Sequence, residues 1–520
     1  MKFTIAQASS VDVTRRSLLI GAAGGAVTAM AASLPKTAFA APSEIVMMDA
    51  LTLAKSIRSR EVSCVEVMTA YLDHIEKFNP KVNAIVALQE RADLLAQAGE
   101  RDRQIARGEV MGPLHGFPHA VKDLAAVKGI RTTMGSPIFK DFVPKADSIM
   151  VDRLRKAGAI FIGKTNTPEF GLGSQTYNQV YGATRNAYDQ TRTSGGSSGG
   201  AAVSLALRML PVADGSDYAG SLRNPAGWNN VFGFRTSYGR VPADARDVWL
   251  PSMGVIGPMA RSVPDLAMLL SVQAGYDSRV PLSIEGTGAD FAGSLQADFK
   301  GKKIAWTGDF NGYLPFEPGV LDVCKQALKV FESMGCIVEE AVPDYPVDAV
   351  WRAWLKLRAW QNGSALLAYY NDPAKRALLK PEAVFEVENG MKLSAYDISA
   401  ASVVRSDWTQ AVRRLFETYD FLIAPTAQVF PFDAGLHWPQ EIAGKKMETY
   451  HEWMKGVLPF TMSGCPALAA PAGFGAHGLP MGIQIVGPNH AEMACLQLAY
   501  AYDAANGWAA SRLPPLLSGV

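Results

Sequence analysis

The sequence predicts an α/β fold built on a mixed or parallel sheet. The chain has 520 residues, of which 48% are hydrophobic, with 47 glycines and 31 prolines, so it can bury a large core and is neither fibrous nor disordered. Helix-like and strand-like patterns alternate along it, as they do in α/β proteins. No Pro/Gly/Ser linker divides residues 43–515. We therefore expect one domain over residues 41–520, with a mostly helical insertion at about 345–418.

Charge and cysteine content narrow the kinds of partner. Lys and Arg number 50 against 49 Asp and Glu, a net charge of +1, so nothing favours binding to nucleic acid or to an anionic membrane surface. We expect a small-molecule partner. The five cysteines, at positions 64, 324, 336, 465 and 495, form no CxxC pair and no short Cys/His spacing. Neither a disulfide framework nor a zinc site is indicated.

The first 40 residues resemble a twin-arginine export signal. Arg15 and Arg16 precede a Gly/Ala-rich apolar stretch at 18–34, and Ala38-Phe39-Ala40 supplies the small-x-small pattern of a signal-peptidase site. We expect cleavage after residue 40 and a periplasmic or secreted protein. Because such proteins are exported already folded, the resemblance also implies that the cysteines need not pair. A membrane anchor is the alternative, but the stretch is weakly apolar and stops at Pro35, so no stable membrane insertion is expected after signal removal.

The first predicted elements are a helix and a strand. Ser63-Cys64-Val65-Glu66 is a capping box, and the helix that it opens is expected to end at Asn79-Pro80. The apolar stripe of this helix consists of Val65, Met68, Leu72, Ile75 and Phe78. Residues 83–88 then have a strand pattern.

The alternation continues in the middle of the chain. A helix is expected from about Asp147 to a stop at Gly158, followed by a β-rich run at 159–162. The remaining predicted elements are a helix that begins at Ser262-Val263-Pro264-Asp265 and a helical pattern between strands at 303–306 and 336–338.

Two familiar motifs match by letter and fail on context. Gly158-Ala-Ile-Phe-Ile-Gly163-Lys164-Thr165 has the P-loop spacing, but its middle residues read as a buried strand and Pro168 blocks the helix that should follow. Gly195-Gly196-Ser197-Ser198-Gly199 has the GxSxG spacing, but polar residues 186–194 precede it where that motif needs an apolar strand. A Ser-His-Asp triad on Ser197 therefore has weak support, although four histidines follow in the required order: His437, His451, His477 and His490.

Three other segments favour catalysis when they are taken together. The Gly/Ser run at 194–200 leads directly into a helix pattern at 201–207, so its backbone N–H groups lie at a helix N-terminus. Asp217-Tyr218-Ala219-Gly220-Ser221-Leu222-Arg223 is a second small-residue turn that carries a serine, and residues 112–123 place Lys122 at the end of a mostly apolar strand. Each alone reads as a linker, a turn residue or a surface lysine. Their coincidence favours an active site.

At these motifs the sequence resembles the amidase signature family of Ser-Ser-Lys hydrolases. The match covers about residues 43–515 and includes the segments 163–169 and 478–484. The resemblance implies that Lys122 is the base, that Ser197 is a bridging serine in a cis peptide setting, and that Ser221 is the nucleophile. It places the oxyanion hole in the backbone N–H groups of the turn from Tyr218 through Ala219 and Gly220 to Ser221. It also implies a central mixed β-sheet covered by helices on both faces, and no metal or organic cofactor.

The chemistry of amide hydrolysis gives independent reasons for these residue types. A serine hydroxyl is a weak nucleophile and needs a base, and with no histidine in the three motifs the available base is lysine acting through a second hydroxyl. Lysine works only when it is neutral, and burial in an apolar strand lowers its pKa. Asp123 follows Lys122, but neighbours on a strand point to opposite faces, so Asp123 need not hold the lysine charged. Returning the proton through Ser197 would then help the amine to leave.

Some positions depart from the family pattern or lie beside the motifs. Ala219 stands where many members have glycine, Tyr218 where a smaller residue is usual, and Ala187 where an Asn-Pro pair is frequent. Tyr218 is expected to line the pocket near the acyl group, and Ala219 to change the shape of the oxyanion hole. His115 and His119 flank the lysine strand and are expected to be packing or pocket-wall residues rather than acid/base groups, and Arg223 is expected to hold the turn rather than to touch substrate.

These observations predict an exported amide hydrolase that forms an acyl-enzyme on Ser221. One alternative is the glutamine-hydrolysing component of a tRNA amidotransferase, which resembles the same family but has cytoplasmic partners. Another is a catalytically silent solute-binding protein, which the presence of all three triad residues disfavours. The sequence leaves aryl, fatty acyl, peptide and cyclic amides open as substrates, and it is compatible with a homo-oligomer without determining the oligomeric state.

Overall fold

The computed structural model describes residues 42–250 and 252–518. The segment interpreted as a twin-arginine signal, residues 1–40, lies outside these described residues, as does the expected cleavage site. No helix in the described ranges combines the length and the apolar character needed to span a bilayer.

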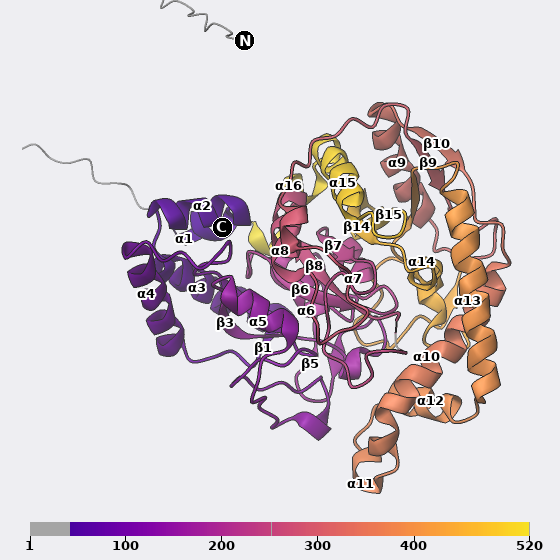
Figure 1. Ribbon diagram of the computed structural model, residues 1–520, viewed down its shortest axis with the longest axis horizontal. Helices are drawn as coiled ribbons and strands as arrows, with labels where there is room; N and C mark the ends of the chain where they lie inside the picture. The colour runs from indigo at the N-terminus through magenta and orange to yellow at the C-terminus, as the bar shows by residue number, and fades with distance from the viewer. Residues whose placement is uncertain (1–41, 251, 519–520) are drawn as a thin grey trace, which may run out of the picture. The chain divides into compact units, whose positions relative to one another are not determined.

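The centre of the fold is an eight-stranded mixed sheet (Figure 1), which confirms the predicted fold class. Its strand order is β10-β9-β11-β15-β14-β7-β8-β6. The first three strands in this order run parallel to one another, and every later neighbour pairs antiparallel. The strands are β6 (Ala213–Asp217), β7 (Phe232–Arg235), β8 (Val255–Ala260), β9 (Lys303–Trp306), β10 (Ile337–Glu340), β11 (Phe421–Pro425), β14 (Ala467–Phe474) and β15 (Pro480–Val486).

Alternate residues of the central strands belong to two different cores. Ile304 and Ile423 pack with α9 and α15, whereas Leu422 packs with α10, α13 and α14. Because successive side chains of a strand point to opposite faces, helices must cover both faces of the sheet, as Figure 1 shows. The helices of these two layers are α9 (Val320–Ser333), α15 (Glu492–Asn506), α10 (Val347–Tyr370), α13 (Ala395–Leu415) and α14 (Leu458–Ser463).

A second, three-stranded sheet carries the predicted lysine strand. Its order is β1-β3-β2, with β2 parallel and β1 antiparallel to β3. The backbone N–H of Lys122, the last residue of β2, donates to Asp214 on β6, so the two sheets meet at this point. The strands are β1 (Ile85–Val86), β2 (Pro118–Lys122) and β3 (Ile160–Thr165), and the two-stranded ribbons elsewhere are β4 (Tyr177–Asn178) with β5 (Gly182–Ala183) and β12 (Glu441–Ile442) with β13 (Lys445–Lys446).

The other helices include most of those that the sequence predicts. The remaining described helices are α1 (Pro42–Met47), α2 (Ala50–Ser59), α3 (Cys64–Val82), α4 (Arg91–Ala106), α5 (Ile149–Lys156), α6 (Gly199–Ala206), α7 (Arg223–Trp228), α8 (Val263–Gln273), α11 (Pro373–Arg376), α12 (Pro381–Gly390) and α16 (Trp508–Ser511). The capping box at Ser63 and the N-cap at Ser262 are both present. The segment 345–418 contains α10 to α13 and is therefore mostly helical, and its interpretation as an insertion stays a prediction.

Two predicted boundaries are wrong. Helix α3 continues through Pro80 to Val82, because a proline in the last turn removes few helical hydrogen bonds and the side chain of Asn79 accepts from the N–H groups of Ala84 and Ile85 beyond the helix. The strand expected over 83–88 is only Ile85–Val86, because Asn83 and Ala87 on either side have positive φ angles of 54° and 49°.

Candidate active site

The three predicted motifs converge on one cavity of about 320 Å³. Lys122 comes from the end of β2, Ser197 from the Gly/Ser loop before α6, and Ser221 from the turn between β6 and α7. All three side chains are buried and all three line the cavity. The tertiary structure therefore brings together residues that are 99 positions apart in the sequence, from Lys122 to Ser221.

Lys122 is held by a ring of hydroxyl and carbonyl oxygens. Its Nζ lies 2.8 Å from Ser197 Oγ and 2.8 Å from Ser198 Oγ, and it also contacts Oγ and the carbonyl oxygen of Ser216 at 3.0 and 3.2 Å. A hydroxyl can donate or accept a hydrogen bond, so these contacts accommodate both the charged and the neutral lysine. The contact with Ser197 is the direct route for a proton between the two residues.

Burial lowers the pKa of Lys122 to about 7, although the carboxylates of Asp214 and Asp217 act in the opposite direction. Asp217 is itself paired with two arginines, since its carboxylate lies 3.0 Å from Arg223 Nε and 3.3 Å from Arg235 Nη1. Burial alone would raise the pKa of Asp217, but these two arginines hold it below its usual range. The pKa of Lys122 is therefore set mainly by the loss of water around it.

Asp123 lies away from the catalytic lysine, as the strand alternation predicts. Its carboxylate accepts from the hydroxyl of Thr133 at 2.5 Å and lies 4.0 Å from Nζ of Lys164. Asp123 thus has its own partners, and it makes no hydrogen bond with Lys122 among the described residues.

The end of the Gly/Ser run leaves no room for a side chain at Gly199 or Gly200. A Cβ on Gly199 would lie 2.4 Å from the hydroxyl of Thr176, and a Cβ on Gly200 would lie 2.4 Å from a backbone nitrogen. The peptide bond between Gly196 and Ser197 is cis, as the family resemblance implies. The N–H of Ser198 donates to the carbonyl oxygen of Ser221 at 3.2 Å, so the loop is joined directly to the turn that carries the predicted nucleophile.

The turn that carries Ser221 depends on Gly220 rather than on its neighbour. Gly220 has a φ of +93°, and a Cβ there would lie 2.1 Å from Oδ1 of Asn224. Ala219 is not among the residues with positive φ, so alanine causes no backbone strain at its position. The expected change in the oxyanion hole at Ala219 therefore has no basis in backbone conformation.

The N–H groups of this turn differ in their availability. Gly220 N–H donates to Asp217 Oδ1 at 2.9 Å, which occupies one of the amides predicted for the oxyanion hole. Within the described ranges, the N–H groups of Tyr218, Ala219 and Ser221 have no such partner. The assignment of Tyr218 and Ala219 to the oxyanion hole stays a prediction, and Ser221 N–H is available beside them.

Arg223 holds the turn, as predicted. Besides its ion pair with Asp217, its Nη1 donates to Oε1 of Gln484 at 2.7 Å and its Nη2 donates to the hydroxyl of Thr461 at 2.8 Å. The segment 478–484 therefore has a structural role near the site, because its last residue, Gln484, accepts a hydrogen bond from the arginine that follows Ser221 and Leu222. Arg223 has no place among the residues that line the cavity.

Histidines contribute nothing to the described cavity lining. His115 and His119 have the structural roles expected of them: His115 contacts the carbonyl oxygen of Arg101, and His119 lies 3.0 Å from Asp214. His451, one of the histidines that a GxSxG triad would need, is buried against Glu386 at 2.9 Å. Ser197 contacts Lys122 instead, and the P-loop lookalike is strand β3, as predicted.

Three residues at the lysine were not identified from the sequence. Ser198, Ser216 and Asp214 each form a hydrogen bond with Lys122. The sequence contains one indication of this grouping. Asp214 and Ser216 are two positions apart on β6, so their side chains point to the same face of that strand. Only the tertiary structure, in which the end of β2 contacts β6 of the other sheet, shows that this side faces the lysine.

A larger cavity of about 850 Å³ adjoins the first. The residues that line both are Tyr218, Ala243, Gly254, Val255 and Asn362. Tyr218 therefore lines both cavities, which agrees with its expected place in the pocket wall. A substrate that reaches Ser221 has room to extend past this ring.

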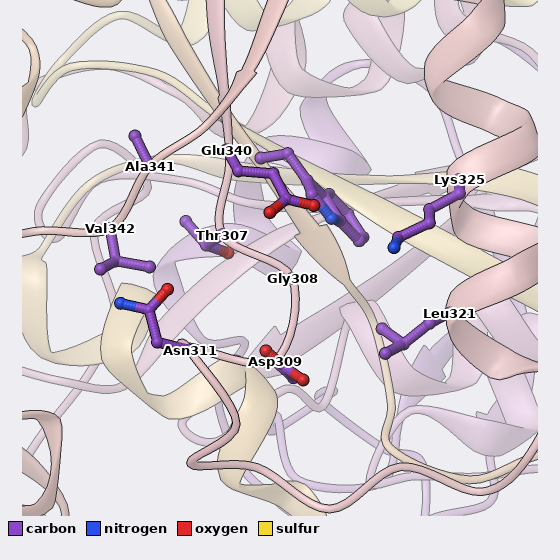
Figure 2. A pocket seen from close by; sticks show the side chains of 10 residues that line it. Thr307, Gly308, Asp309, Asn311, Leu321, Lys325, Glu340, Ala341 and Val342 are labelled. Atoms are coloured by element: carbon purple, nitrogen blue, oxygen red, sulfur yellow. The ribbon is translucent and has the colours of Figure 1, made fainter.

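A third cavity, of about 210 Å³, shares no lining residue with these two (Figure 2). It lies where the parallel strands β9 and β10 end, and Figure 2 shows Asp309, Asn311, Lys325 and Glu340 around it. None of the predicted catalytic residues lines it, so it is separate from the candidate active site.

Comparison with known proteins agrees with this geometry. Residues 66–496 match the amidase family model. The chain is 34% identical over 469 residues to an acylamidase of Rhodococcus erythropolis, a match that covers 89% of this chain and 96% of the relative. It is 33% identical over 483 residues to a glutamyl-tRNA(Gln) amidotransferase component of Thermosynechococcus vestitus, covering 88% of this chain and 97% of that protein.

A solved structure shares the architecture over most of this chain. The crystal structure of a bacterial aryl acylamidase of the amidase signature family superimposes with a TM-score of 0.84 at 29% identity, over 90% of this chain and 99% of the other. The sequence match, the shared fold and the three converging motifs lead to one conclusion. The chain belongs to the amidase signature family and is a hydrolase of that family.

Proposed function

We propose that this protein is an exported amidase that hydrolyses the C–N bond of a non-peptide or small carboxylic amide through an acyl-enzyme on Ser221. The observation that carries the proposal is the buried contact between Lys122 Nζ and Ser197 Oγ at 2.8 Å, in a cavity that Ser221 also lines. A lysine with a pKa near 7 is partly neutral at physiological pH and can therefore accept a proton.

In the first half of the reaction, Ser221 loses its proton to Ser197 as Ser197 passes its own proton to neutral Lys122. Ser221 Oγ then forms a bond to the carbonyl carbon, and the N–H groups of the turn stabilise the resulting oxyanion. The relay reverses to protonate the amide nitrogen as the C–N bond breaks, so the product leaves as a neutral amine. In the second half, water attacks the ester by the same relay and the carboxylic acid is released.

The relatives support an acyl amide as the substrate. The name acylamidase belongs to a protein that is 34% identical to this chain, and aryl acylamidase to the structure with a TM-score of 0.84. The substrate of this chain is accordingly proposed to be an N-acyl amide with an apolar or aromatic part, for which the cavity past Tyr218 offers room.

The second candidate function is that of the glutaminase in an amidotransferase, which the 33% identity to an amidotransferase component favours. The twin-arginine pattern at Arg15 and Arg16 argues against it, because an exported glutaminase would be separated from cytoplasmic partners. We propose a periplasmic or secreted location on the basis of that pattern.

A substrate panel separates the candidates. Purified protein should release the aniline from N-acyl 4-nitroanilides, and mass spectrometry after rapid quenching should find the acyl group on the peptide that contains Ser221. The Ser221→Ala variant should show neither. Hydrolysis of free glutamine with no release from any acyl anilide would support the glutaminase, and binding of amides without turnover would support a solute-binding protein.

A further inference from the structure

Arg358, in the middle of α10, lines the cavity that contains Lys122, Ser197 and Ser221. Only 3% of Arg358 is exposed, so its guanidinium is a buried cation at the wall of the active site. Its Cζ lies 5.3 Å from the centre of the Tyr218 ring, which places it against the first residue of the nucleophile turn. A buried cation beside the reacting groups requires an account of each of its hydrogen bonds.

Two of the three guanidinium nitrogens have hydrogen-bond partners. Nε donates to Oε1 of Glu386 at 2.7 Å and lies 3.1 Å from Nε2 of His451, and Nη2 donates to the hydroxyl of Tyr450 at 3.0 Å. These contacts anchor the side chain from the direction of α12. Nη1 has no hydrogen-bond partner among the described residues, although it carries two N–H groups.

A second donor without a partner lies one turn further along the same helix. Asn362 also lines the cavity, and its Nδ2 is buried without a hydrogen bond to any described residue. Positions four apart on a helix face the same side, so Nη1 of Arg358 and Nδ2 of Asn362, neither of which bonds to a described residue, are donors on one side of α10. Leaving Nδ2 of Asn362 buried without an acceptor destabilises the free protein, and an acceptor brought by a ligand would remove that cost.

The other charges of the cavity limit what the ligand can be. Asp214 and Asp217 are hydrogen-bonded to protein groups, and Asp244 accepts from the N–H of Ile149 at 2.6 Å. Because these carboxylates already have protein partners, none of them requires a cationic ligand in the cavity. The N–H groups on Nη1 of Arg358, by contrast, have no acceptor among the described residues. The matching chemistry is an oxygen acceptor, either a carbonyl or a carboxylate.

We infer that Arg358, assisted by Asn362, is a specificity-determining residue that binds an acceptor oxygen carried by the substrate outside the scissile amide. This inference rests on the proposed amidase function and narrows its substrate class to amides with a second carbonyl or carboxylate group. Substrates without that oxygen would leave the two donors unsatisfied and would be hydrolysed less efficiently.

The test compares substrates of equal shape. The probes are 4-nitroanilides with glutaryl, 5-oxohexanoyl and 5-methylhexanoyl groups, which end in a carboxylate, a ketone and a branched alkane. A second series places a carboxylate, an acetyl or an isopropyl group on the aniline ring of acetanilide, in case the oxygen lies on the amine side. In wild type, kcat/KM for one oxygen-bearing probe should exceed that of its alkyl counterpart by about tenfold to a hundredfold, the range for a hydrogen bond to a charged group.

The variants separate recognition from folding. Removing Arg358 alone would leave Glu386 without its ion-pair partner, so the test uses the double variant Arg358→Met with Glu386→Gln. The single variant Glu386→Gln is the matched control, because it breaks the same ion pair and keeps Nη1. The preference for the oxygen-bearing probe should fall at least tenfold in the double variant and should stay within about threefold of wild type in the control.

The same comparison is made without turnover. Dissociation constants of the probe pair in Ser221→Ala should show the same preference, so the test does not depend on the proposed nucleophile. Absence of a preference in both series, in kcat/KM and in binding, would overturn the inference. An equal loss for all probes in the double variant would also overturn it, because that result would assign Arg358 a purely structural role. Hydrolysis by Ser221→Ala would instead contradict the proposed function.

Discussion

Asp217 and Arg223 form a fully buried ion pair directly beneath the turn that carries Ser221. The carboxylate and Nε are 3.0 Å apart, and neither side chain has exposed surface. Asp217 also accepts from the N–H groups of Gly220 and Leu222, so this pair fixes the turn on both sides of the serine. The geometry of the proposed nucleophile therefore depends on two residues that need not touch substrate.

Replacing Asp217 by Asn should destabilise the protein strongly. The substitution leaves Arg223 and Arg235 buried with an unbalanced charge, and the loss of one partner of a buried pair costs about 3–5 kcal/mol in the free energy of unfolding. Denaturant unfolding would measure the change. The matched control is Asp73→Asn, whose partner Arg91 is 44% exposed and whose ion pair should contribute about 0–1 kcal/mol. Equal losses in the two variants would contradict the role assigned to the buried pair.

Replacing Lys122 by Arg should abolish amidase activity nearly as completely as Lys122→Ala. Arginine keeps the positive charge but does not lose a proton in a protein, so it fails as a general base, whose contribution is about 10²–10⁴-fold. Amides should suffer more than esters, because an amine leaving group needs the returned proton. Lys156→Arg, at a largely exposed lysine, is the control. Retention of most amidase activity in Lys122→Arg would reduce lysine to an electrostatic role.

The pH dependence of kcat/KM should follow the neutral form of the buried lysine. Burial lowers the pKa of Lys122 to about 7, and only the deprotonated amine accepts a proton, so kcat/KM should rise with pH through about 7 and then level off. A pH series with an N-acyl anilide measures this. A limb centred near the ordinary lysine pKa of about 10.4 would show that the relay does not use a desolvated lysine.

A fluorophosphonate probe should label Ser221 and leave Ser197 unmodified. The nucleophile attacks phosphorus, whereas the bridging serine only relays a proton, so peptide mapping by mass spectrometry should find the adduct on the peptide that contains Ser221. The adduct should disappear in Ser221→Ala. Labelling of Ser197 instead would revive the GxSxG interpretation.

Gly220→Ala should impair catalysis far more than a matched glycine substitution. A Cβ there meets Asn224 Oδ1 at 2.1 Å in a backbone of φ +93°, so the turn must shift, and a displacement of about 1 Å at a reacting group can cost about a hundredfold in rate. Gly444→Ala is the control, because Gly444 has φ +81° and nothing within 4 Å of an added Cβ. Its cost should be limited to backbone strain of about 1–2 kcal/mol with kcat unchanged. Similar kcat values in the two variants would refute the special role of the turn.

The export proposal is tested separately. The double variant Arg15→Lys with Arg16→Lys should leave folded, active enzyme in the cytoplasm, whereas the wild-type protein should appear outside it with Ala41 as its first residue. Cell fractionation and N-terminal sequencing measure both outcomes. Mature protein that still carries residues 18–34 would indicate a membrane anchor.

Local patterns in the sequence were enough to predict much of the secondary structure and the three segments that carry Lys122, Ser197 and Ser221. Capping residues such as Ser63 and Ser262 act within one helical turn, and the alternation that turns Asp123 away from Lys122 is a property of a single strand. The resemblance of the motifs to one family then identified Lys122, Ser197 and Ser221 as candidates. These inferences need only residues that are close in the chain or a pattern already known.

The tertiary structure alone decided which groups surround those candidates. Asp214 and Ser216 reach Lys122 because β6 lies beside β2, and Arg358 reaches the cavity because α10 packs against the nucleophile turn at Tyr218. The strand is shorter than the predicted 83–88 for a local reason, because Asn83 and Ala87 have positive φ angles that interrupt it. Contacts between segments more than ninety residues apart depend on strand order and helix packing, which no local pattern encodes. That packing buries Lys122, which lowers its pKa, and it places Arg358 at the cavity.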